Sequence, residues 1–296
     1  MDKEKKTFYC GVALTLLSAF CYSLNSNFAA ISYAEGAEPL SVLTTRIVVG
    51  SIGLYLLLKI KKVSLALSLR DVLAATGLGI FLSVGSFCLL SSFQYIPVAL
   101  AILIFYLFPL MTAIGAWIMD REPLTPIFVM ALVFALVGLA LALNIGGNNF
   151  DIKGVGLAMA AALAITFLML FNSKLVKGKD PRSITLIILS SNAVIFVVVD
   201  LVVGRFLLPT TSVGMVAFFG VAVAYSFAII IMFFANAMIG PVRTSLFLNF
   251  EPVSTIILGF FVLGQVLTPL QLLGAAIVIA AITLAGRQKM AMMARE

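Results

Sequence analysis

The chain has 296 residues, of which 62% are apolar and 10% are charged, whereas a soluble domain carries about 25% charged residues. This balance excludes a water-soluble fold for most of the chain, because a soluble surface needs more side chains that water can solvate. The net charge of +7 does not indicate nucleic acid as a partner, because the basic residues lie at the edges of apolar runs and not in a stripe with aromatics.

Ten apolar runs are long enough to cross a membrane, since a spanning helix needs roughly 20 consecutive residues of this kind. Charges, proline or glycine bound the runs, and little chain is left between them. The runs predict helices over residues 8–33, 39–59, 70–94, 97–118, 124–144, 153–173, 183–203, 212–237, 241–263 and 268–286. We therefore expect an all-α membrane protein with ten transmembrane helices, its partner being the lipid bilayer.

Lysine and arginine fall mainly on one side when alternate loops are assigned to opposite faces of the membrane. With the N-terminus inside, sixteen basic residues are cytoplasmic, and only Lys153 and Arg205 lie outside. Because cytoplasmic loops carry the excess of positive charge, both termini are expected in the cytoplasm. The expected location is the bacterial inner (plasma) membrane.

An internal repeat appears when the chain is shifted by 143 positions. The shift places Pro109 on Pro252, Thr112 on Thr255, and the Leu-Thr-Pro of 124–126 on that of 267–269. Residues 1–144 and 145–296 are therefore expected to form two repeats of five helices. An odd number of spans inverts the second repeat, an architecture typical of secondary transporters with alternating access to a central site. A duplication that now only packs as a bundle is the alternative.

Two ionisable side chains lie clearly within the predicted spans, where insertion costs about 2.5–3.5 kcal/mol. Arg46 is suited to bind a carboxylate in two-point contact. Glu251 has three interpretations, namely binding a substrate ammonium group, proton coupling, or structural pairing with Arg46 or Arg243. Asp200 lies near an outer helix end and can reach water by a small adjustment.

Uncharged polar residues share helix faces with aromatic or methionine side chains, and together they suggest a mixed pocket for a small-molecule substrate. Pro109 and Pro252 each remove a backbone hydrogen bond and predict a helix break or hinge. Each polar residue has an alternative interpretation as a helix-to-helix hydrogen bond. The full set of substrate-binding candidates is Tyr22, Asn25, Arg46, Ser83, Tyr106, Tyr225, Asn236, Asn249 and Glu251.

The sequence contains no histidine, which excludes Ser-His-Asp and Cys-His sites and removes the commonest zinc ligand. Its three cysteines lie far apart in apolar stretches and suit neither a disulfide framework nor a metal site. Carboxylates form no cluster at helical spacing. We expect no catalytic set, no metal and no cofactor, so the protein is not predicted to be an enzyme.

Three motifs carry a resemblance to a known family. They are Leu43-Thr44-Thr45-Arg46, Leu107-Phe108-Pro109-Leu110 with the following Asp120-Arg121-Glu122, and Phe250-Glu251-Pro252-Val253. On these residues the whole chain resembles a ten-helix member of the drug/metabolite transporter superfamily, of the EamA type. Two positions depart from the pattern, with Gln265 in place of a closing Glu and Tyr22 where the family often has Trp.

The resemblance implies a secondary carrier with a central cavity, commonly an exporter of amino acids or other small metabolites. Arg46 and Glu251 would then be electrostatic partners for a zwitterion, which makes amino acids the first expectation. The alternative function is a passive pore or facilitator, although no continuous polar path is visible in the spans. The sequence leaves monomer and homo-oligomer open.

Overall fold

Helices make up most of the computed structural model, which describes residues 3–121, 125–143, 151–204, 206–264, 266 and 268–293. Within these ranges the backbone forms helices, turns and bends but no strand, so the prediction of an all-α protein is confirmed there. The helices are α1 Lys3–Ala34, α2 Pro39–Ile60, α3 Leu69–Ser92, α4 Val98–Phe105, α5 Phe108–Asp120, α6 Pro126–Ala142, α7 Ile152–Leu175, α8 Pro181–Val203, α9 Ser212–Ile239, α10 Pro241–Leu248, α11 Phe250–Leu263 and α12 Pro269–Met293.

Several features of the sequence analysis lie outside the described residues. They are the boundary between 144 and 145, Glu122, Gln265, and the leucines Leu124 and Leu267 of the repeated motif.

Prolines and polar caps set the helix starts. Proline has no amide hydrogen to leave unpaired in a first turn, and it is the first residue of α2, α6, α8, α10 and α12. Thr125 caps α6 by accepting a hydrogen bond from Phe128 N at 3.4 Å, and Asp180 caps α8 by accepting one from Arg182 N at 2.9 Å. These residues interrupt the apolar runs, which explains why the helix starts lie close to the predicted ones.

Eight helical stretches of the described chain are long and apolar enough to cross a membrane. The 17-residue α6 and residues Pro269–Leu284 of α12 are also apolar but shorter. In order and position the ten stretches match the ten predicted runs, and length and composition support eight of them as spans.

The predicted spans 97–118 and 241–263 each consist of two helices, because proline interrupts the hydrogen-bond ladder. An amide at position 109 would bond the carbonyl of Phe105, which is the last residue of α4. In the same way, the amide that Pro252 lacks would bond the carbonyl of Leu248, the last residue of α10. Both prolines thus lie in the first turn of the helix that follows an interruption.

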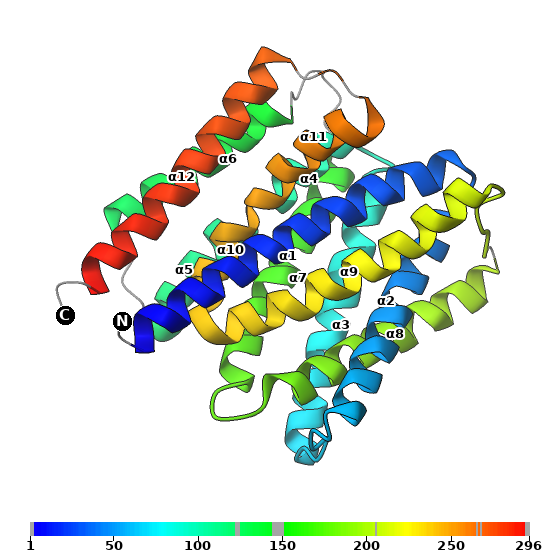
Figure 1. Cartoon of the computed structure of the whole chain (residues 1–296), viewed down its shortest axis with the longest axis horizontal. Helices are drawn as coiled ribbons and strands as arrows, with labels where there is room; N and C mark the ends of the chain where they lie inside the picture. Colours follow the sequence, from blue (N-terminus) through cyan, green and yellow to red (C-terminus); the bar gives the residue numbers. More distant parts are fainter. Residues whose placement is uncertain are drawn as a thin grey trace.

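Helices that are distant in the sequence pack side by side. α1 lies along α9, and α6 lies along α12 at one edge of the molecule (Figure 1). α3 packs on α7 and α2 on α8, while smaller contacts join α1 to α11 and α5 to α7. The first and second halves of the sequence are therefore interleaved rather than set apart as two bundles.

The outside of the bundle is apolar and its interior contains polar side chains. Phe87, Phe227 and Phe261 are 57%, 60% and 75% exposed, whereas Ser18 and Asn192 are fully buried. A protein in water would have the reverse arrangement, whereas in a bilayer the hydrocarbon solvates the exposed apolar surface. Hydrogen-bonding groups therefore meet one another inside the bundle.

Candidate functional site

Two tyrosines and an arginine meet where α1, α2 and α9 approach one another. The Tyr22 ring lies edge to face against the Tyr225 ring, with 6.0 Å between their centroids. The Cζ atom of Arg46 lies 4.4 Å from the centroid of the Tyr225 ring, a cation–π contact. Its Nη1 donates a hydrogen bond to Asn25 Oδ1 at 3.2 Å. Arg46 is thus held by an aromatic face and an amide, and neither of them neutralises its charge.

Glu251 joins this group from the first turn of α11. The hydroxyl of Tyr106, between α4 and α5, lies near the Glu251 carboxylate, and Arg46 is close enough to interact with that carboxylate electrostatically. Tyr22 interacts with both charges. The three ion pairs among the described side chains include neither Arg46 nor Glu251, so these two opposite charges are neighbours without a salt bridge.

The structure therefore brings together six of the nine predicted substrate-binding residues. Tyr22, Arg46 and Glu251 are half-buried, and the other members of the group, Asn25, Tyr106 and Tyr225, are 4–6% exposed. Arg46 Nε is buried without a hydrogen-bond partner, a costly arrangement unless another acceptor completes it. The group can offer a guanidinium to an anion, a carboxylate to a cation, and aromatic rings to apolar atoms.

The other three predicted residues bond to neighbouring helices or to their own helix. Ser83 Oγ donates to Asn192 Oδ1 at 2.7 Å and thereby joins α3 to α8. Asn236 Nδ2 donates to Met169 O at 3.1 Å, between α9 and α7. Asn249 Nδ2 donates to Leu246 O at 2.9 Å in the turn before it. These contacts fit the alternative interpretation of polar residues as hydrogen bonds within and between helices.

Two polar residues that were not candidates secure the helices around the site. Asn27 Nδ2 of α1 donates to Thr255 O of α11 at 3.3 Å, and Thr166 Oγ1 of α7 lies 3.3 Å from Phe108 O at the start of α5. Asn27 lies two residues after Asn25 on α1 and therefore on a different face of that helix, and nothing in the sequence separates it from other interior polar residues. The two contacts tie α11 and α5, the helices that follow the interruptions, to long helices.

Connecting loops meet at each end of α2. At its C-terminal end, Lys179 Nζ pairs with Asp71 Oδ1 at 2.5 Å and Ser183 Oγ donates to Ser64 O at 2.9 Å. We call these contacts the lysine clamp. At its N-terminal end, Thr211 Oγ1 donates to Glu35 Oε2 at 2.7 Å and Leu207 N donates to Ser41 Oγ at 2.9 Å. We call these the glutamate clamp. Each clamp joins a loop of the first half of the sequence to a loop of the second.

The described residues contain no set of three or more His, Cys, Asp or Glu side chains placed to hold a metal ion. The buried polar groups of this part of the chain are hydroxyl, amide and phenol groups and the carboxylate of Asp200, while Arg46 and Glu251 are half-buried.

Comparison with known proteins identifies both sequence and fold relatives. A model of the EamA-like transporter family matches residues 10–144 and 152–287. A solved structure described only as "Crystal structure of protein" aligns with a TM-score of 0.78 at 18% sequence identity, over 92% of this chain and 97% of its own. At this identity the likeness concerns the fold alone. The curated proteins include no match to the sequence.

Proposed function

The chain belongs to the EamA-like transporter family, as its motifs predicted, and from this premise we propose that it is a secondary transporter that exports amino acids or similar small metabolites by alternating access. Its family and its apolar helices identify it as an integral membrane transporter. The substrate, the direction and the mechanism are the parts that we propose.

Two inverted repeats, residues 1–144 and 145–296, form the proposed framework. A shift of 143 positions carries α4, Val98–Phe105, onto the bounds of α10, Pro241–Leu248. Under the same shift α1 corresponds to α7, α3 to α9, and α6 to α12. The packing of α1 on α9 therefore has its counterpart in the packing of α7 on α3, and the contact between α6 and α12 is its own counterpart. Because each half crosses the membrane five times in this scheme, the second half enters from the opposite side.

A pair of close helix contacts supports the same relation. A Cβ at Gly11 would lie 2.3 Å from Ile239 Cγ2, and a Cβ at Gly154 would lie 2.8 Å from Ile96 Cγ2. Gly154 follows Gly11 by 143 positions, and Ile239 follows Ile96 by the same number. A glycine therefore admits an isoleucine from the other half at both related positions, which favours two halves packed by one symmetry rule.

The two clamps support alternating access. The lysine clamp and the glutamate clamp each connect the halves, at opposite ends of α2. Opening one clamp while the other stays closed would expose the central group to one side of the membrane. With both termini in the cytoplasm, as the basic loops favour, the lysine clamp faces the cytoplasm of a bacterial cell and the glutamate clamp faces outside.

The observation that carries the amino-acid proposal is the unpaired placement of Arg46 and Glu251. One charge comes from each half, both are half-buried, and they are neighbours without a salt bridge. A zwitterion satisfies both, since Arg46 can hold its carboxylate in two-point contact and Glu251 can hold its ammonium group. Tyr22, Tyr106 and Tyr225 supply aromatic surface for the side chain, and Asn25 orients Arg46.

Counterflow in proteoliposomes tests the proposal. Vesicles of the purified protein, loaded with an unlabelled amino acid, should take up the labelled one with saturation and transient accumulation. Linear, unsaturable flux would instead indicate a passive pore, and no exchange across a broad amino-acid panel would contradict the substrate class. Exchange that responds to a proton gradient in the wild type but not in Glu251→Gln would assign proton coupling to Glu251.

A further inference from the structure

A cavity of about 600 Å³ lies beside the lysine clamp, apart from the central site. Its walls are the loop between α2 and α3 and the loop between α7 and α8, so each half of the chain contributes one side. The charged residues that line it are Lys61, Lys62, Asp71, Lys179, Asp180 and Arg182.

The acidic residues of this cavity are already neutralised, and two of its lysines are not. Asp71 pairs with Lys179 at 2.5 Å and Asp180 pairs with Arg182 at 2.6 Å. The Arg182 guanidinium also holds the pKa of the Asp180 carboxyl below its ordinary value, so this carboxylate stays ionised and paired. Lys61 and Lys62 are exposed and belong to none of the three ion pairs among the described side chains. The cavity therefore carries an excess of two positive charges.

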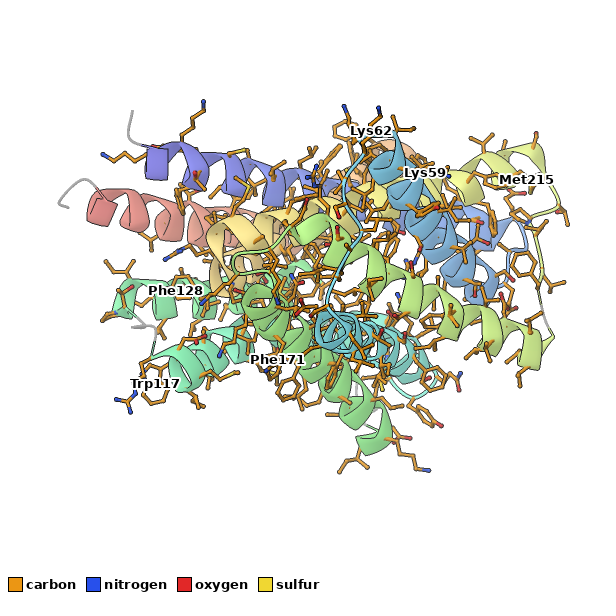
Figure 2. The ribbon with its side chains drawn as sticks, turned by 90° about the horizontal axis from the view of Figure 1, so that it is seen from below. Lys59, Lys62, Trp117, Phe128, Phe171 and Met215 are labelled. Carbon is orange, nitrogen blue, oxygen red and sulfur yellow. The ribbon has the colours of Figure 1, made fainter. Side chains whose placement is uncertain are left out.

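Exposed apolar side chains lie on and next to the loop that carries Lys61 and Lys62. Ile60 and Leu69, at the ends of the loop that carries both lysines, are 78% and 74% exposed, and Leu65 within it is 40% exposed. Lys59, in the last turn of α2, is a further cation close to Lys62 at this end of the helix (Figure 2). Lysine ammonium groups over an apolar surface match a phosphate group that is joined to acyl chains.

We propose that this cavity binds a phosphate-bearing anion, and that the anion is the headgroup of an anionic phospholipid. Lys61 and Lys62 contact the phosphate oxygens, while Ile60, Leu65 and Leu69 lie against the acyl chains. On the proposed transport function, a headgroup held between the two loops strengthens the lysine clamp and favours the arrangement that is closed at this end.

Thermal stability in detergent tests the binding without any transported substrate. Purified protein is titrated with short-chain phosphatidylglycerol, short-chain phosphatidylcholine or inorganic phosphate, because a ligand of the folded state raises the midpoint of unfolding. We expect a saturable rise with phosphatidylglycerol and little change with the other two. Lys61→Gln/Lys62→Gln should raise the half-saturating concentration roughly thirtyfold, since a lysine near an anionic surface contributes about fivefold.

Lys5→Gln/Lys6→Gln is the matched control, since it removes two lysines that the topology places at the same end and that do not line the cavity. It should keep the wild-type response within about twofold, as should Lys61→Arg/Lys62→Arg, which retains both charges.

Equal losses of lipid affinity in the two glutamine variants would overturn the site, because the lipid would then respond to the overall positive charge at this end of the molecule. An equal response to phosphatidylcholine would overturn recognition of the anion. Inorganic phosphate acting at the same concentrations would overturn the lipid assignment and leave a phosphate site. None of these results depends on the central site, so the transport proposal is tested separately.

Discussion

The two proposed halves agree in framework and differ in chemistry. Where the first half has Arg46, the second has Leu189, which is fully buried, and where the second half has Glu251, the first has Phe108, which is 3% exposed. Helix ends and glycine contacts are duplicated, but the central charges are not. A symmetric site would hold two arginines and two glutamates and suffer repulsion between like charges. One charge from each half instead creates a dipolar site that suits a zwitterion.

The two helix interruptions show the same contrast. Tyr106 and Asn249 occupy related positions, each just after the first short helix of the pair. Tyr106 reaches the Glu251 carboxylate in the other half, whereas Asn249 bonds the carbonyls of its own helix. One proline-induced break thus serves the proposed site through its side chain, and the other places Glu251 in the turn that follows it.

The largest expected effect comes from removing one central charge at a time, which would break the asymmetry. Glu251→Gln should lose affinity for an amino acid by roughly thirtyfold or more, because truncating one member of a buried charge contact costs about 2–5 kcal/mol. It should still bind the analogue that lacks the amino group. Arg46→Gln should show the converse: it loses the carboxylate contact but should still bind the analogue that lacks the carboxylate. Competition against labelled substrate measures the binding of each of the two analogues to each of the two variants.

Glu38→Gln serves as the control for this experiment, since it removes a carboxylate from a loop outside the central group. Its substrate affinities should match the wild type. If both central variants lost all ligands equally, with unchanged thermal stability, the assignment of one charge to each end of the substrate would be wrong.

The next largest effect concerns the shared framework. Gly11→Val and Gly154→Val each place atoms where an isoleucine side chain of the other half already lies, and overpacking of this kind costs about 1–3 kcal/mol. We expect both variants to lose thermal stability to a similar extent while those that fold keep wild-type substrate affinity. Gly53→Val, where a Cβ would meet nothing within 4 Å, is the matched control. A large loss in only one variant would argue against equivalent halves.

The sequence could predict the framework because its signals are local. Apolar length defines a membrane helix, and proline marks its start or interruption. Arg46 and Glu251 were also predictable as special, since an ionisable residue within an apolar run is costly and needs a reason. These inferences need only residues that are close together in the chain.

The sequence could not predict which polar residues lie in the central group and which join helices, because this depends on partners far away in the sequence. Tyr106 and Ser83 both suggested a pocket, but Tyr106 meets Glu251 and Ser83 meets Asn192. Asp200 was expected to need only a small adjustment to reach water, but it is 7% exposed and both of its carboxylate oxygens are buried without a hydrogen-bond partner. Its place near the end of α8 did not reveal this burial.

A smaller effect should distinguish the two clamps, which differ in the type of bond. Lys179→Gln removes an ion pair between exposed groups, which contributes little in water, and should change the exchange rate by up to about fivefold at low salt. Glu35→Gln retains an oxygen that can accept from Thr211, so its effect should stay within about twofold. Because salt screens an exposed ion pair, the Lys179→Gln effect should shrink at high ionic strength.

Vesicles of zwitterionic lipid keep this comparison separate from the proposed headgroup site, which Lys179 also lines. The measurement is initial exchange at low and high salt in wild type and both variants. A salt-independent Lys179→Gln effect, or an equally large Glu35→Gln effect, would contradict the assignment of an ion pair to one clamp and hydrogen bonds to the other.

The smallest expected effect belongs to the Tyr22 hydroxyl. It lies 3.8 Å from Met232 Sδ, and a thioether is a weak acceptor, whereas the ring packs against Tyr225 within the central group. Tyr22→Phe keeps the ring and should lower substrate affinity less than about twofold, while Tyr22→Ala should cost more because it also removes the aromatic contact, worth about 0.5–1.5 kcal/mol. A tenfold loss in Tyr22→Phe would instead mean that the hydroxyl bonds the substrate, since a hydrogen bond to a charged group contributes about 1.5–3 kcal/mol. The polar half of the site would then extend along α1, beyond the charge contributed by each half.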